Sequence, residues 1–314
     1  MATLDDNVIL VEILPKLPTK SLIRFKCVSK SFNSAISSPE LIDLHLRHHR
    51  ISSSDHHLIL PGLSSIECYD MNPSLSRSTG TSTFTWSDSS YVSVVGSTNG
   101  LLCVIVRYVH NSEYHACILN PTTRMHRDIR IPFPGVRVYN IGFGFEFDPQ
   151  TVDHKIVLIT NHTHDETLIT MVFSLKNNSW NIIQTPQLPG DLVFRYNYTS
   201  GILINNNLLH WILWNPDTRI SRIVCFNVSE NYWTNDVLLP DIPYNDPTHG
   251  IHYPYEIGVL NGRLVTCIKN ENNHEGLYEV WVMEEYGVQH SWFSVEIRRS
   301  CLGVLVVRGF LIEV

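Results

Sequence analysis

A repeat of about 54 residues runs through most of this 314-residue chain and constrains its fold more than any other feature. Turn-forming polar residues precede a short apolar run at Asn99, Asp153, Asn206 and Asn261, at spacings of 54, 53 and 55 residues. Each run has the length of one strand and is bounded by Asn, Gly, Asp or Pro, which is typical of antiparallel strands joined by tight turns.

A second marker follows the same period. A large side chain begins an apolar run after a polar turn at Met125, Trp180, Trp233 and Trp292, at spacings of 55, 53 and 59 residues. All-β repeats of roughly 40–50 residues, with about four strands in each, are typical of propeller blades. The two markers together therefore predict a propeller-like domain, with the tryptophan rings packed between neighbouring blades.

The repeat extends over most of the chain after residue 90. Four repeats lie between Val92 and Ile297, a partial one lies near Leu58–Trp86, and the chain ends within another apolar run at Val304–Val314. We expect residues 91–314 to form the propeller-like domain, with a last blade that is incomplete. Residues 51–90 should be a connecting segment that carries the partial blade and a Ser/Thr-rich surface loop over Ser74–Ser90.

The first fifty residues have a helical pattern. An apolar stripe from Val8 to Leu17 is interrupted by Pro15 and Pro18, so it must break into short pieces. Residues that can cap a helix N-terminus precede three further apolar patterns: Thr19, Ser29 and Ser38. Three or four short helices expose more apolar surface than so small a unit can hide. The unit either packs on the rest of the chain as a helical cap or binds a partner.

The segment Ile9–Phe32, ILVEILPKLPTKSLIRFKCVSKSF, resembles the F-box family in nearly every apolar position and in its L-P-x-K-S-L core. Two positions differ from the family pattern, because Asp5-Asp6 replaces an opening Leu-Pro and Phe32 replaces a tryptophan. The resemblance implies that residues 1–50 bind a Skp-type adaptor and, through it, a cullin and its RING subunit. The chain would then be a non-catalytic substrate-recognition subunit of a ubiquitin ligase of the Skp-cullin-F-box (SCF) type.

The resemblance also implies which residues contact the adaptor. An apolar face with two lysines at its rim is expected from Ile9, Ile13, Leu14, Leu17, Pro18, Leu22, Val28 and Phe32, with Lys20 and Lys30. Residues 1–50 carry seven basic and five acidic side chains, whereas the remainder carries 16 basic and 25 acidic ones. A basic rim would steer association with an acidic adaptor.

The chain after residue 90 resembles the F-box-associated, kelch-like domain of plant F-box proteins. The resemblance rests on five segments: Gly100–Cys103, Leu119–Arg124, Gly142–Asp148, Asn177–Trp180 and Trp281–Val288. The last segment, with Ser291-Trp292, is similar to the S-locus branch, for which the target would be a pistil ribonuclease taken up by pollen in self-incompatibility. Related plant members instead restrain immune receptors, and the target protein itself remains unknown. Loops should contact it, through Tyr108, Tyr114, His162, His164, Tyr244, His249 and Tyr253.

No motif in the sequence predicts catalysis or a cofactor. Gly142 and Gly144 lack the third glycine and the helix of a dinucleotide site. His162 and His164, like His249 and His252, have metal-ligand spacing without converging cysteines, so we expect no metal. The net charge of −7 argues against nucleic acid, and no apolar run reaches membrane-helix length.

The compartment and two alternative functions complete the expectations. Seven cysteines without a C-x-x-C pair, and an acidic start rather than a secretory leader, indicate a cytoplasmic or nuclear location. One alternative is a non-degradative interaction protein with a defective target site. The other is a small-ligand or glycan-binding propeller, or a hydrolase.

Overall fold

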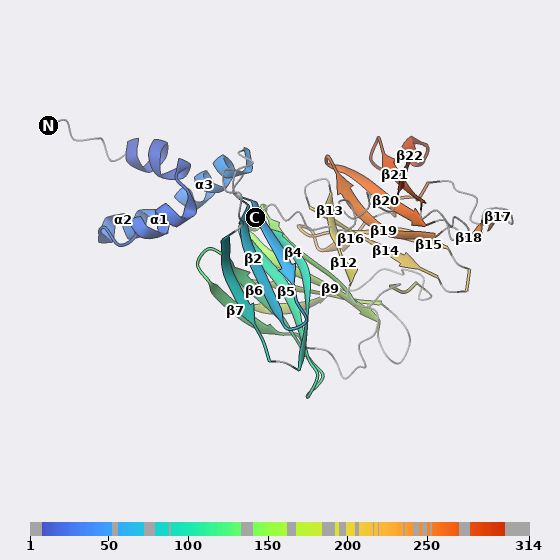
Figure 1. Cartoon of the computed structure of the whole chain (residues 1–314), viewed down its shortest axis with the longest axis horizontal. Helices are drawn as coiled ribbons and strands as arrows, with labels where there is room; N and C mark the ends of the chain where they lie inside the picture. The colour runs from blue at the N-terminus through green and yellow to red at the C-terminus, as the bar shows by residue number, and fades with distance from the viewer. Residues whose placement is uncertain are drawn as a thin grey trace.

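The computed structural model describes residues 8–51, 56–71, 79–87, 89–132, 141–161, 168–183, 192–194, 199–204, 207–215, 217–218, 220–234, 236–240, 245–246, 250–251, 253–269 and 277–298. The helices gather at one end of the molecule and the sheets form the rest (Figure 1). A small helical unit is therefore followed by a β domain, as the sequence predicts.

The helical unit consists of η1 (Val8–Ile13), η2 (Leu14–Lys16), α1 (Thr19–Phe25), α2 (Lys30–Ile36) and α3 (Pro39–Ile51). The expected caps are confirmed at two helices: Ser29 Oγ accepts a hydrogen bond from Phe32 N at 3.1 Å, and Ser38 Oγ accepts one from Leu41 N at 3.3 Å. Thr19 is not a cap. Pro18 holds the N-cap position and Thr19 is the first residue of α1, because proline fits a helix start where the N–H would be unpaired.

Five successive sheets in the described residues correspond to blades. Blade 1 contains β1 (His56–Pro61), β2 (Ser65–Met71) and β3 (Thr79–Thr85). Blade 2 contains β4 (Ser90–Thr98), β5 (Leu101–Tyr108), β6 (Glu113–Asn120) and β7 (Met125–Arg130). Blade 3 contains β8 (Gly142–Asp148), β9 (Asp153–Asn161), β10 (Leu168–Ser174) and β11 (Ser179–Ile183), with β12 (Thr199–Ser200) parallel to β8.

Blade 4 contains β13 (Ile202–Ile204), β14 (Leu208–Trp214), β15 (Ser221–Asn227) and β16 (Tyr232–Trp233). A separate pair, β17 (Asn245–Asp246) and β18 (Gly250–Ile251), follows it. Blade 5 contains β19 (Tyr253–Leu260), β20 (Arg263–Lys269), β21 (Leu277–Met283) and β22 (Trp292–Arg298), with the short helix η3 (Gln289–Ser291) before its last strand.

The first sequence marker is confirmed as the turn into the second strand of a blade. Runs after Asn99, Asp153, Asn206 and Asn261 form β5, β9, β14 and β20. Asn99 and Asn261 each have φ of 50°, and the glycine after each has φ of 76° and 74°. Two consecutive left-handed residues form the tight hairpin turn that Asn-Gly favours.

The second marker is confirmed as the fourth strand of a blade, and its tryptophans join neighbouring blades. Trp180 donates its indole N–H to Arg130 O of blade 2 at 3.1 Å, and Trp233 donates to Thr170 Oγ1 of blade 3 at 3.0 Å. Trp292 donates to Leu238 O, in the segment after blade 4, at 3.0 Å. The ring therefore fills an apolar interface while its polar edge is satisfied. Met125, the marker of blade 2, is instead 70% exposed.

The blades pack face to face in chain order. On β5, Leu102, Val104 and Val106 pack with blade 1, whereas Cys103 and Ile105 pack with blade 3. Successive side chains of a strand point to opposite faces, so a strand buried on both faces needs an unbroken apolar run. This explains why the runs of the repeat are continuously hydrophobic rather than alternating.

The start of the repeat differs from the expectation, and its C-terminal end is not described. Residues Thr79–Thr85, expected within a surface loop, form β3, where Phe84 is buried against blade 2. The apolar run Val304–Val314 lies outside the described residues. Blade 1 and blade 5 lie well apart in Figure 1, so the described blades form an open arc. In the parts of the chain that the structure describes, no helix has both the length and the apolar character needed to cross a membrane.

Candidate functional site

The helical unit has its own small core. Leu14, Leu22, Ile36 and Leu41 are at most 5% exposed and pack together, with Ile9, Leu10, Leu17 and Phe32 partly buried around them. Leu14 and Leu22, which were expected to contact an adaptor, are buried in this core instead of lying on the surface. Their side chains hold the helices together, because they lie where apolar residues of several elements meet.

A histidine joins two parts of this unit. His45 of α3 donates from Nδ1 to the carbonyl of Pro15 at 3.0 Å, since a carbonyl can only accept. The other ring nitrogen, Nε2, lies within hydrogen-bond distance of the Thr19 hydroxyl, at 3.1 Å. Nothing in the spacing of the sequence places α3 against the Pro15–Thr19 turn, so the sequence does not predict this contact. The contact holds in place the turn that carries Leu17 and Pro18.

An apolar surface remains exposed on the helical unit. We define the docking surface by its exposed apolar residues: Val8, Val11, Ile13, Phe25, Val28 and Ile42, which are 37–65% exposed. Val28 is the most exposed of them, at 65%, and follows α1 in a turn. Six exposed apolar side chains within residues 8–42 are candidates for contact with a partner.

The predicted residues fall into three groups in the structure. Ile13, Pro18, Lys20, Val28 and Lys30 are exposed, whereas Ile9, Leu17 and Phe32 are partly buried; Leu14 and Leu22 are the two buried ones. The sequence interpretation missed Val8, Val11, Phe25 and Ile42 as exposed residues. Val8 and Phe25 belong to the apolar patterns that predict the helices, so the signal was present. No signal in the sequence indicates the direction in which each of these side chains points.

The aromatic residue at position 32 contributes to the core and to the edge of the docking surface. Phe32 packs against the core, and its ring meets that of Phe25 edge to face, with centroids 6.5 Å apart and planes at 77°. Edge-to-face pairs of this kind add to the free energy of burial. Phenylalanine therefore fills the position at which the family pattern has tryptophan.

The predicted target-binding residues are less well placed. Tyr114 is 6% exposed and lies in the core between blades 2 and 3, so its side chain is not on the surface, contrary to expectation. Tyr108 is half-buried and meets His115 edge to face at 5.1 Å; burial, then the charge of Asp128, raises its pKa. Tyr253 begins β19, but its side chain is not described. His162, His164, Tyr244 and His249 lie outside the described residues.

A Cys-His-Tyr group is buried between blades 4 and 5. His210 donates from Nδ1 to Ile202 O at 3.2 Å and accepts at Nε2 from the Tyr286 hydroxyl at 2.6 Å, and Cys225 Sγ lies 4.0 Å from that hydroxyl. Burial lowers the pKa of His210 and raises the pKa of Cys225 to about 11. The thiol stays protonated near neutral pH, so the group acts as a packed polar link between blades.

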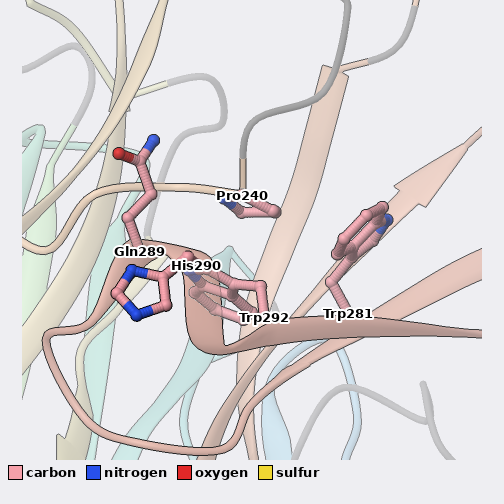
Figure 2. Close-up of a pocket in the computed structure, with 5 residues that line it drawn as sticks. All are labelled: Pro240, Trp281, Gln289, His290 and Trp292. Carbon is pink, nitrogen blue, oxygen red and sulfur yellow. The ribbon is translucent and has the colours of Figure 1, made fainter.

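Blade 5 carries a surface pocket of about 260 Å³. Its lining residues are Pro240, Trp281, Gln289, His290 and Trp292. Figure 2 shows the two tryptophans and the proline ring around one space, with Gln289 and His290 beside Trp292. Among the described side chains, no three His, Cys, Asp or Glu residues gather where they could hold a metal ion.

The chain combines a small helical unit that exposes apolar side chains with a propeller-like array of blades. An F-box domain model matches residues 6–44, and an F-box associated beta propeller domain model matches residues 56–301. The chain therefore belongs to the family of F-box proteins with an associated β-propeller domain.

Two curated relatives and one solved structure illustrate what the chain is similar to. F-box protein CPR1 of Arabidopsis thaliana is 27% identical over 94% of this chain and 73% of its own length. An F-box/kelch-repeat protein of the same plant is 26% identical over 90% of this chain and 76% of its own length. The propeller of Dos1 covers 74% of this chain and 67% of its own, at 9% identity and a TM-score of 0.43.

Proposed function

We propose that this protein is the substrate-recognition subunit of an SCF-type ubiquitin ligase. The docking surface binds a Skp-type adaptor, which links the chain to a cullin and its RING subunit. The propeller-like domain holds a target protein. Tethering raises the effective concentration of the target's lysines near the conjugating enzyme, so this chain needs no catalytic group of its own.

The observation that carries the proposal is the docking surface itself. Burial of its apolar residues would contribute at roughly 25 cal/mol per Å² of apolar area removed from water. Exposed basic residues, Arg24 and Lys30 among them, border it on α1 and α2. A basic border of this kind increases the association rate with an acidic adaptor and depends on salt concentration.

The test is binding of the full chain to a purified Skp-type adaptor. Val28→Asp places a charge on the most exposed residue of the docking surface, so we expect at least tenfold weaker adaptor binding with an unchanged melting temperature. Leu63→Asp is the matched control, because Leu63 is 78% exposed on blade 1, away from the docking surface. Equal adaptor affinity for wild type and Val28→Asp would contradict the assignment of this surface.

The pathway and compartment are further parts of the proposal. The six cysteines described as free fit a reducing cytoplasm or nucleus, which imaging of a tagged chain would test. The resemblance to the S-locus branch supports a secreted ribonuclease as the target, and pollen-restricted expression is the expected result. Expression in leaves would contradict that target and favour restraint of immune receptors.

A further inference from the structure

The pocket on blade 5 presents ring faces, and three side-chain donors of its lining already have partners. Trp281 Nε1 donates to Glu279 Oε2 at 3.1 Å, and Trp292 Nε1 donates to Leu238 O at 3.0 Å. Gln289 Nε2 donates to Leu239 O at 3.0 Å, and that carbonyl fixes which end of the amide is nitrogen. The ring of His290, which is exposed, also lines the pocket and takes part in none of these three hydrogen bonds.

One acceptor, the carboxylate of Glu279, lies beside the pocket rather than in its lining. The Glu279 carboxylate adjoins the Trp281 ring and accepts one indole N–H there, which leaves further lone pairs on its two oxygens. A ligand for this pocket should therefore donate hydrogen bonds and carry positive charge.

The aromatic lining adds a second requirement. Trp281 and Trp292 stand on adjacent strands, β21 and β22, and Figure 2 shows both rings beside the space that Pro240 closes on another side. Indole is the aromatic group that attracts cations most strongly, and guanidinium also stacks flat on it. The aliphatic stem of an arginine would contact the proline ring and the tryptophan faces.

The surrounding charge points to the same ligand. Glu284 and Glu285 are exposed in the turn after β21, and the chain after residue 50 carries 25 acidic against 16 basic side chains. An acidic field attracts a basic partner and raises the association rate. The small volume suits one side chain rather than a folded surface.

We infer that this pocket binds an arginine side chain of the target protein, with the guanidinium stacked on Trp281 and paired with the Glu279 carboxylate. The inference rests on the proposed role as a substrate receptor and names the chemistry by which the target is read. Arginine is favoured over lysine because its planar fork can stack and bond to a carboxylate at the same time.

The experiment uses the full chain in complex with the adaptor, labelled with ¹⁵N in its seven tryptophan indoles. The probe is the peptide acetyl-Gly-Arg-Gly-amide, titrated to several millimolar, with citrulline and lysine in place of arginine as matched peptides. We expect saturable shifts of the Trp281 and Trp292 indole signals with arginine. Citrulline, which is isosteric and uncharged, should bind at least tenfold more weakly, and lysine at least threefold more weakly.

Three variants test which residues bind the arginine peptide. Glu279→Gln keeps an oxygen that accepts the Trp281 N–H but loses the charge, so arginine affinity should fall at least threefold. Glu284→Gln removes an exposed carboxylate in the turn after β21, whereas Glu279 is the carboxylate bonded to Trp281, so this control should change affinity less than twofold. Trp281→Leu removes one indole signal and so identifies the signal of Trp281. In this variant the arginine peptide should no longer shift the Trp292 signal. An unchanged melting temperature shows that blade 5 remains folded.

The outcomes separate this inference from the proposed function. Equal binding of citrulline and arginine, binding of lysine as tight as arginine, or an unchanged affinity of Glu279→Gln would overturn the arginine pocket. Adaptor binding is measured on the same samples and does not involve blade 5. If the pocket fails while the adaptor binds, the pocket inference alone is wrong; if the adaptor does not bind, the proposed function is wrong.

Discussion

A buried ion pair lies at the contact between blades 3 and 4, and removal of one partner should be strongly destabilising. Lys155 Nζ of β9 lies 2.9 Å from Asp148 Oδ2 at the end of β8, with the two side chains 6% and 0% exposed. The same ammonium donates to Val228 O, just after β15, at 2.8 Å. The Ser229 hydroxyl donates to Asp148 Oδ1 at 2.7 Å. The pair therefore joins two strands of one blade to a turn of the next.

Lys155→Met keeps the aliphatic stem and removes the charge. Asp148 is then a buried carboxylate without a cation, and removal of one partner of such a pair costs about 3–5 kcal/mol. Hydroxyl and backbone donors from Ser229, Thr151 and Gln150 remain on the carboxylate, which places the expected loss near the lower end. At about 2–4 °C per kcal/mol for a domain of 150–250 residues, the melting temperature should fall by roughly 10 °C.

Urea unfolding followed by tryptophan fluorescence measures the loss. Arg130→Met is the matched control, because its ion pair with Glu113 is exposed, with the arginine side chain 70% accessible. Exposed pairs contribute about 0–1 kcal/mol, so the control should lose less than about 1 kcal/mol. If Lys155→Met lost no more than Arg130→Met, the pair would not stabilise the interface between the blades and the reasoning would be refuted.

The pH dependence of this pair has a definite sign. Burial alone would raise the pKa of Asp148, but hydrogen bonds from Ser229, Thr151 and Lys155 outweigh it, so the pKa lies well below the ordinary 3.8. A lowered carboxyl pKa contributes stability above pH 3.8 that is lost as the pH falls towards the folded pKa. Wild type should therefore lose more stability than Lys155→Met between pH 4 and pH 2.

Two further perturbations test the packing of blade 3. Burial lowers the pKa of His154 from 6.5 to about 4, against the opposing charge of Asp153, so stability is complete above pH 6.5 and is lost as the pH falls towards 4. Between pH 7 and pH 5, His154→Phe should lose about 2 kcal/mol less unfolding free energy than wild type, because the titrating group is gone. An equal loss in both proteins would contradict the burial argument. Gly142→Ala would place a Cβ 2.7 Å from Phe194 Cε1 and should cost about 1–3 kcal/mol by overpacking. Gly96→Ala, whose nearest atom is at 3.5 Å, is the control, and an equal loss for both variants would show that the clash is relieved.

The fold could be predicted largely because turn chemistry and strand content repeat with one period. Asn99-Gly100 and Asn261-Gly262 adopt the left-handed pair that their composition favours, so the turn and the strand after it follow from local sequence. Polar Thr79–Thr85 was misread because a strand of Ser and Thr has no apolar run. It is a strand because it pairs with β2, and long-range pairing is not written in local composition.

The site could be predicted less completely, for a physical reason. In short helices separated by Pro15 and Pro18, apolar residues occur on all sides, so spacing does not tell the core from the docking surface. Leu14 and Val28 illustrate this, since both belong to the family-like segment but are 2% and 65% exposed. The link from His45 to the Pro15 carbonyl depends on a tertiary contact across 30 residues, and the blade 5 pocket likewise joins residues from Pro240 to Trp292.

Affinity purification of the full chain from proteasome-inhibited plant cells tests the central claim most directly. Wild type should recover the Skp-type adaptor, the cullin and at least one ubiquitinated protein. Val28→Asp should lose the adaptor and the cullin, and with them the ubiquitin on the captured protein, while Leu63→Asp behaves as wild type. Recovery of a captured protein by wild type without any adaptor or cullin would contradict the account.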